Sequence, residues 1–208
     1  MEIIFNRPSE VYLENKRGLE TIDTNQLFLL VNKSVEPTAD IIKKLYQKKI
    51  WQKDVYNQSI NISKNMIFIF QLLGHPWSII FLDFSGVLIK EEDAQIISQS
   101  LQTNAIYYRG SDTSSTAKYL LYSKGIMIEK YIFENGVIAE FQSLERNLDV
   151  NNISRGTIVD RLVTERDAYI PSIYWDYSPN EEINFCGRNV LKFTNLFPED
   201  IIRMDCLS

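Results

Sequence analysis

The chain has 208 residues, of which 45% are hydrophobic, 12% aromatic and 24% charged. These fractions are typical of one globular domain and exclude a disordered chain or a collagen-like repeat. With 22 basic and 27 acidic residues, the formal net charge is −5, which disfavours nucleic-acid binding because phosphate contacts need a basic face. One histidine and two cysteines are too few for a zinc site, so we expect no metal and no cofactor.

The first 25 residues are polar and mixed, without the basic segment and long apolar core of a signal peptide. We expect an irregular N-terminal arm over 1–25 and a single domain over 26–208. Cys186 and Cys206 are expected to be free thiols, because a chain with so few cysteines is typical of a reducing compartment. The sequence therefore favours a cytoplasmic location.

Strand and helix patterns begin at residue 26. Residues 26–32 (QLFLLVN) are typical of a buried strand, and Thr38 is expected to cap a helix over 39–49, where apolar residues recur at helical spacing. A short strand is expected over 50–56. This order of strand, helix and strand predicts a domain of mixed composition.

Residues 66–89 form a mostly apolar stretch that is long enough to span a bilayer. Gly74, His75 and Pro76 interrupt its middle, and Asp83 follows. A central proline and an acid disfavour a membrane helix, whereas two strands joined by a turn explain both halves. We therefore predict a hairpin over 66–84 in the middle of the core sheet, and no membrane contact.

The clearest helical periodicity covers residues 90–102, which begin with carboxylates at the positive end of the helix dipole. The other expected elements are strands over 104–108, 118–123, 126–133, 168–177 and 189–194, a turn at 134–136, a helix over 153–167 and a short helical turn from residue 198. Hairpins are frequent in this order. It predicts an α+β fold, with a largely antiparallel sheet and two or three helices packed on one face.

The loop over residues 109–116 carries the most suggestive binding chemistry. Its ligand-binding candidates are Arg109, Ser111, Asp112 and Thr113. An arginine and hydroxyl groups can hold a phosphate or a carboxylate, but the glycines and the lysine of a P-loop are absent. The alternative interpretation is a polar connection stabilised by Asx and Ser/Thr turns.

Aromatic residues provide candidate protein contacts. Tyr107 and Tyr108 precede the polar loop, and Tyr174 and Trp175 lie in an aromatic segment further along the chain. Tyrosine and tryptophan are frequent anchors of protein interfaces, although large aromatic side chains also fill cores.

His75 is the only imidazole of the chain. No nucleophile motif or orienting partner accompanies it, so we interpret it as a turn residue whose ring caps the backbone or lies beside Trp77. The sequence therefore predicts no catalytic residue.

Three short patterns are GHPW at 74–77, EEDAQ at 91–95, and IYY followed by SDT within 106–113. Through them, residues 26–177 resemble a family of uncharacterised bacterial proteins. No activity is known for that family, so the resemblance implies no catalytic residue. It only makes the SDT segment more worth testing.

The negative charge, the abundant aromatic residues and the lack of a catalytic motif favour a non-enzymatic, acidic protein-binding or accessory protein, of the immunity, regulatory or assembly-factor type. The partner is then another protein. The alternative is an enzyme or a small-ligand sensor that uses the 109–116 loop. A concave pocket beside this loop favours the alternative, and capping of backbone amides by Asp112 on an open surface counts against it.

Overall fold

The computed structural model describes residues 3–5, 16–21, 26–55, 66–82, 89–150, 153–177, 189–193, 196 and 200–208. These parts contain the helices α1 (Val35–Leu45), α2 (Glu91–Leu101) and α3 (Arg155–Thr164). The strands are β1 (Ile3–Phe5), β2 (Gly18–Leu19), β3 (Gln26–Val31), β4 (Trp51–Gln52), β5 (Ile67–Leu72), β6 (Ser78–Leu82), β7 (Asn104–Ser111), β8 (Thr116–Ser123), β9 (Ile126–Glu134), β10 (Val137–Ser143), β11 (Tyr169–Ile170), β12 (Ile173–Tyr177), β13 (Asn189–Phe193) and β14 (Ile201–Leu207).

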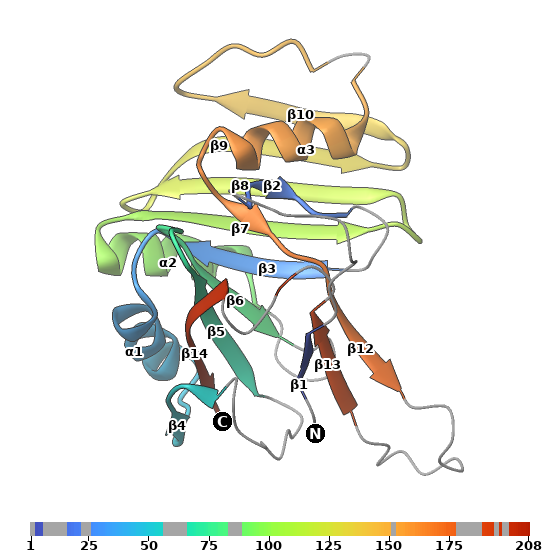
Figure 1. The fold of residues 1–208 in the computed structure, drawn as a ribbon. Coiled ribbons are helices and arrows are strands. Elements are labelled where there is room, and N and C mark those ends of the chain that lie inside the picture. The colour runs from blue at the N-terminus through green and yellow to red at the C-terminus, as the bar shows by residue number, and fades with distance from the viewer. Residues whose placement is uncertain are drawn as a thin grey trace.

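A nine-stranded sheet in the order β10-β9-β8-β7-β3-β6-β5-β14-β4 organises the fold (Figure 1). All neighbouring strands of this sheet are antiparallel. Two smaller sheets, β1-β13-β12 and β11-β2, accompany it. The prediction of a single α+β domain built on a largely antiparallel sheet is confirmed.

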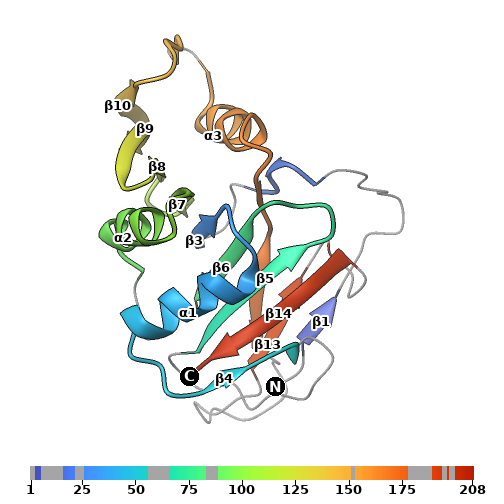
Figure 2. The ribbon, with the colours of Figure 1, turned by 90° about the vertical axis from the view of Figure 1, so that its left-hand side faces the viewer.

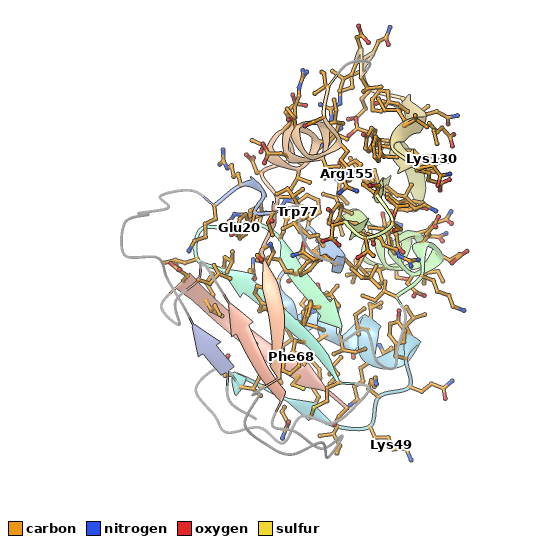
Figure 3. The ribbon with its side chains drawn as sticks, turned by 90° about the vertical axis from the view of Figure 1, so that its right-hand side faces the viewer. Glu20, Lys49, Phe68, Trp77, Lys130 and Arg155 are labelled. Atoms are coloured by element: carbon orange, nitrogen blue, oxygen red, sulfur yellow. The ribbon has the colours of Figure 1, made fainter. Side chains whose placement is uncertain are left out.

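Helices and the smaller sheets cover the large sheet from two sides. Helices α1 and α2 pack on one face, where their apolar residues share a core with alternate residues of β3. Helix α3 packs on the opposite face, and Figures 2 and 3 show the three-stranded sheet on this same side, opposite α1. Two helices thus share a face as predicted, and the third covers the other face.

A row of aromatic side chains crosses the sheet on the face that α3 covers. In register from β5 to β10, the row consists of Phe68, Phe81, Phe28, Tyr108, Tyr119, Tyr131 and Phe141. The residues from β5 to β9 are at most 2% exposed, whereas the last one, on β10, is only partly buried. Aromatic cross-strand pairs stabilise neighbouring strands, so this row links the sheet from its centre to one edge.

The predicted hairpin over 66–84 is confirmed by β5 and β6, whose side chains are almost all buried. Trp77 directly precedes β6. It is 1% exposed, and its Nε1–H donates to the carbonyl of Arg166, which follows α3 (2.9 Å; Figure 3). Asn135 and Gly136 form the predicted turn between β9 and β10 with φ of 53° and 80°, as a type I′ turn requires. Among the described residues, no helix is long and apolar enough to cross a membrane.

Helix α1 begins earlier than the sequence predicts. Thr38 lies inside the helix, where its Oγ1 donates to the carbonyl of Ser34 at 2.9 Å. Pro37 is tolerated because it falls in the first helical turn, where backbone N–H groups have no partner within the helix. The predicted start at residue 39 is wrong, because Pro37 is compatible with the first turn of the helix.

The C-terminal element is a strand. The helical turn expected from residue 198 lies mostly outside the described residues, and Asp200, its described part, has 3-10 geometry directly before the strand. Strand β14 pairs with β5 along its length and with β4 at its end. Asp205 in this strand is fully buried, and it accepts hydrogen bonds from Trp51 Nε1 (2.8 Å) and from the guanidinium of Arg203 (2.8 and 2.9 Å). These bonds allow charged residues in a buried strand.

Within residues 1–25, the described parts form two short strands. Ile3–Phe5 pairs in parallel with β13, and Gly18–Leu19 pairs in parallel with β11. Gly18 has φ of 85°, and a Cβ at this position would lie 2.1 Å from Asp160 Oδ1 on α3. The close approach lets the carboxylate accept a hydrogen bond from the Leu19 N–H at 2.9 Å. This segment is therefore fastened to the domain.

Candidate functional site

The predicted binding loop is a tight polar turn between β7 and β8. Asp112 Oδ1 accepts hydrogen bonds from the backbone N–H and the hydroxyl of Thr113, at 2.6 and 3.1 Å. Ser111 Oγ accepts one from the Ser114 N–H at 3.3 Å. Residues 112–115 are all exposed. Asp112 thus caps a backbone amide on an open surface, as in an Asx turn, which counts against its use as a ligand-binding carboxylate.

A hollow of about 280 Å³ lies beside this turn. Its lining residues are Arg109, Ser114, Thr116, Ala117, Lys118, Phe133 and Glu134. Of the four predicted ligand-binding residues, only Arg109 lines it. The Lys118 ammonium pairs with Glu91 at 2.5 Å, so one of the two cations already has a partner. The Arg109 guanidinium interacts with Tyr107, and the hydroxyls of Ser114 and Thr116 are 2.9 Å apart and bond to each other. These groups could still contribute donors to a small anionic group, but only alongside these existing bonds.

Arg155 of helix α3 contacts both the turn and the wall of the hollow. Arg155 Nη1 donates to the carbonyl of Ser111 at 3.0 Å, and its guanidinium lies 5.8 Å from the centre of the Phe133 ring. In Figure 3 Arg155 lies between α3 and the sheet, and Lys130 lies on the far side of the strands. The turn is therefore held in place by a half-buried cation as well as by its own hydrogen bonds.

Tyr107 and Tyr108 are core residues, 4% and 2% exposed. They point to opposite faces of β7, and each face is covered by a helix layer. Burial raises the pKa of both phenols, that of Tyr108 to about 12. Their prediction as protein contacts is wrong because β7 is covered on both sides. Tyr174 and Trp175 lie in β12, and their side chains are outside the described part of the structure.

A buried carboxylate that the sequence analysis missed lies between β9 and α3. Glu129 is 1% exposed and accepts two hydrogen bonds from Arg146, at 2.5 and 2.7 Å. Ser143 Oγ and Tyr119 Oη donate to it at 3.2 and 3.3 Å, and Arg166 Nη2 lies at 3.8 Å. These partners engage both oxygens of Glu129, so the side chain is a structural anchor rather than a free base. The only signal in the sequence was an acid within an otherwise apolar alternation.

His75 lies at the β5–β6 turn beside a cavity of about 100 Å³. Its Nε2 is hydrogen-bonded to the carbonyl of Lys16, so this nitrogen carries the proton and Nδ1 holds the lone pair. Nδ1 is buried, and no described group bonds to it. Burial, more than any other cause, lowers the pKa of His75. The ring caps the backbone as predicted, and it fastens the 16–21 segment to the central hairpin.

Ion pairs border the same cavity. Arg17 Nη1 lies 3.0 Å from Asp167 Oδ1, and Lys16 pairs with Asp200. Lys16 and Arg17 of the N-terminal segment thus pair with the two acids that line the cavity. We therefore interpret the cavity as a space left beneath this segment and not as a ligand site.

Other reactive groups are scarce in the described part of the chain. It holds no cluster of three or more histidine, cysteine or acidic residues that could bind a metal ion. Cys206 is a buried free thiol, and burial raises its pKa to about 12, which makes it a poor nucleophile. Cys186 lies outside the described residues.

Large apolar side chains are exposed where β9 begins and β10 ends. Ile126 is 63% exposed, Met127 37% and Leu144 74%. The Leu144 N–H donates to the carbonyl of Ile128 at 2.8 Å, which brings the end of β10 beside the start of β9. We name this set of three side chains the apolar corner. All three lie at the end of the hairpin away from its turn, and their exposed apolar surface is available for contact with a partner.

The chain matches no model of a known protein family, no curated protein and no solved structure. The resemblance drawn from the GHPW, EEDAQ and IYY–SDT patterns stays a prediction. What the chain does is therefore argued from its own geometry.

Proposed function

We propose that this chain is a non-enzymatic, acidic protein-binding or accessory protein, of the immunity, regulatory or assembly-factor type, acting in the cytoplasm. The apolar corner carries the proposal, because Ile126, Met127 and Leu144 expose apolar surface at one end of the same hairpin. The net charge of −5 supports it by favouring protein partners over nucleic acid.

The reactive groups agree with a binding role. His75 donates its ring proton to a backbone carbonyl, Glu129 is held by Arg146, and the thiol of Cys206 is buried. Each group is thus engaged in holding the fold. A group so engaged is not poised for proton transfer or nucleophilic attack.

Capture from the lysate of the source cells tests the proposal. Tagged wild-type protein should retain a specific partner, and Leu144→Asp should release most of it, because a carboxylate in an apolar interface loses its hydration without compensation. Leu73→Asp is the matched control: Leu73 is 71% exposed against 74% for Leu144, but it lies at the β5–β6 turn. Absence of any specific partner, or equal loss in both variants, contradicts the proposal.

A second candidate function is a small-ligand sensor that uses the hollow beside residues 109–116. The hollow of about 280 Å³ is the observation that favours it, together with the Arg109 guanidinium and the hydroxyls of Ser114 and Thr116 on its wall. Ligand pockets commonly start at about 300 Å³, so a small anion is the fitting size class.

Thermal unfolding with phosphate, sulfate and acetate distinguishes this candidate. Binding raises the melting temperature with ligand concentration, and Arg109→Ala should abolish the rise. Lys33→Ala, at an exposed position outside the hollow, is the control. Equal responses of the two variants would assign the effect to nonspecific salt stabilisation.

A further inference from the structure

We propose that the outer edge of β10 binds an extended segment of a partner protein, with alternating apolar and basic side chains, as an added strand of the sheet. The inference rests on the proposed protein-binding function and specifies how the partner is held. Strand β10 has β9 on one side and no described strand on the other. Figure 2 shows it at the end of the sheet, with the chain that follows leading over to α3.

The backbone of β10 offers hydrogen-bonding groups at this edge. Leu144 N–H bonds to the carbonyl of Ile128, and antiparallel strands alternate between bonded and outward-facing residues. The N–H and C=O groups of Ser143 and Phe141 therefore point away from β9, whereas those of Gln142 point toward it. No described backbone group bonds to these outward groups. An added strand would satisfy them, as in β-strand addition.

The aromatic row requires apolar side chains on one face of the added strand. Phe141 ends the row, and its inner neighbour Tyr131 is fully buried while Phe141 itself is only partly covered. Ile138 on the same face is also partly buried against this core. An apolar residue in the next position of the row would bury the outer side of Phe141.

The charge of β10 and its neighbours favours basic residues on the face of the added strand that points away from α3. It also disfavours a second copy of this chain as the added strand. Strand β10 (VIAEFQS) has one acid, Glu140, and no base. Lys130 on β9 pairs with Glu140 at 2.5 Å, and the exposed Glu134 beside the start of β10 leaves these three side chains with one excess negative charge. Antiparallel pairing of two copies about the strand centre would bring the two Glu140 side chains together, which is destabilising. The register shift between Ile138 and Glu140 is a β-bulge, which also hinders self-pairing.

The probe is the peptide acetyl-Lys-Val-Lys-Val-Lys-Val-Lys-amide added to the full-length protein, with amide hydrogen exchange as the readout. Strand addition should slow exchange at Phe141 and Ser143 by at least about fivefold, the effect of one net hydrogen bond. Gln142 and Leu144 are internal controls, because their amides face β9 and should not change. A peptide with glutamate for lysine should bind more weakly, and one N-methylated at alternate valines should not bind.

Ser143→Pro tests the edge from the protein side. Proline removes the outward N–H of residue 143 and leaves the bonds to β9 in place. Ser143→Ala is the matched control, since both variants lose the hydroxyl that contacts Glu129. We expect Ser143→Pro to lower the affinity for the Lys-Val peptide at least about fivefold relative to Ser143→Ala.

The inference is overturned if no peptide protects Phe141 and Ser143, or if protein concentration alone protects them, which would identify a second copy as the occupant. It is also overturned if Ser143→Pro retains the partner captured from lysate as well as Ser143→Ala does. In that case the proposed function still stands. Failure of the wild-type protein to capture any partner would instead remove the proposed function, independently of the peptide result.

Discussion

The middle of the large sheet and its outer hairpin are built in opposite ways. All six residues of β3 are buried, whereas none of β10 is. Strand β3 lies under α1 and α2 on one face and faces the α3-side core on the other. Strands β9 and β10 are covered mainly from the α3 side (Figure 2). Coverage on both faces produces continuous apolar runs, and coverage on one face produces mixed ones.

Different interactions hold the two regions. The middle depends on apolar burial, such as the Phe28 and Phe81 rings with centres 5.5 Å apart. The outer hairpin depends more on charges: Glu129 is buried against Arg146 on one face, and Lys130 pairs with Glu140 at 2.5 Å on the other. The difference indicates that the middle supplies most of the stability, and that the hairpin is free to present its edge.

Truncating one aromatic residue in each region should give the largest contrast. Phe28→Ala removes a fully buried ring and should lower the free energy of unfolding by about 3–5 kcal/mol. Phe141→Ala, at the partly exposed end of the same row, should cost less than half as much, because folding buries less apolar surface of Phe141 than of Phe28. Urea denaturation measures both. Equal losses would show that the hairpin is as tightly packed as the middle.

Neutralising the buried carboxylate should come next in size. Glu129→Gln leaves Arg146 and Arg166 without their buried counter-charge and should cost roughly 3 kcal/mol. Glu140→Gln is the control on the neighbouring strand, where the Lys130 pair is partly exposed and contributes less than about 1 kcal/mol. Urea denaturation again gives the difference. A similar small cost for both substitutions would contradict the role of Glu129 as an anchor.

The middle of the sheet and its edge strand β4 could be predicted from the sequence, whereas β10 and β14 could not. The hairpin of β5 and β6 was visible because its apolar runs flank Gly74 and Pro76. Strand β10 was missed because the bulge between Ile138 and Glu140 interrupts the two-residue alternation. Strand β14 was missed because Arg203 and Asp205 resemble surface residues until their mutual hydrogen bonds are seen.

The candidate site was harder to predict than the fold. Arg109 does line the hollow, but Thr116 and Lys118 come from the next strand, and only the β7–β8 register brings them beside it. Tyr107 and Tyr108 read as surface aromatics because a sequence does not show that helices cover both faces of a strand. Glu129 is paired with Arg146 and lies near Arg166, and local sequence patterns do not show that these residues meet in the fold.

Mild acid should weaken the attachment at the central hairpin. The folded state lowers the pKa of His75 below its ordinary value of 6.5, so the unfolded chain binds the proton more readily. The contribution of neutral His75 to the free energy of unfolding is fully present above about pH 6.5. It is lost as the pH falls below 6.5 through the lowered pKa of the folded state. We expect His75→Gln to have a flatter stability profile between about pH 7 and 5.5 in urea denaturation. A profile parallel to that of the wild type would contradict this assignment.

Leu144→Asp should have the smallest effect on stability, although it should have a large effect on partner binding. Leu144 is 74% exposed, so its replacement exposes little new surface and should change the free energy of unfolding by no more than about 0.5 kcal/mol. Leu73→Asp should behave alike, and urea denaturation of both variants provides the check. If Leu144→Asp alone unfolds the protein, the apolar corner belongs to the core of the hairpin. If both variants stay folded and only Leu144→Asp loses the partner, its side chain is a contact, because stability and binding then separate at one residue.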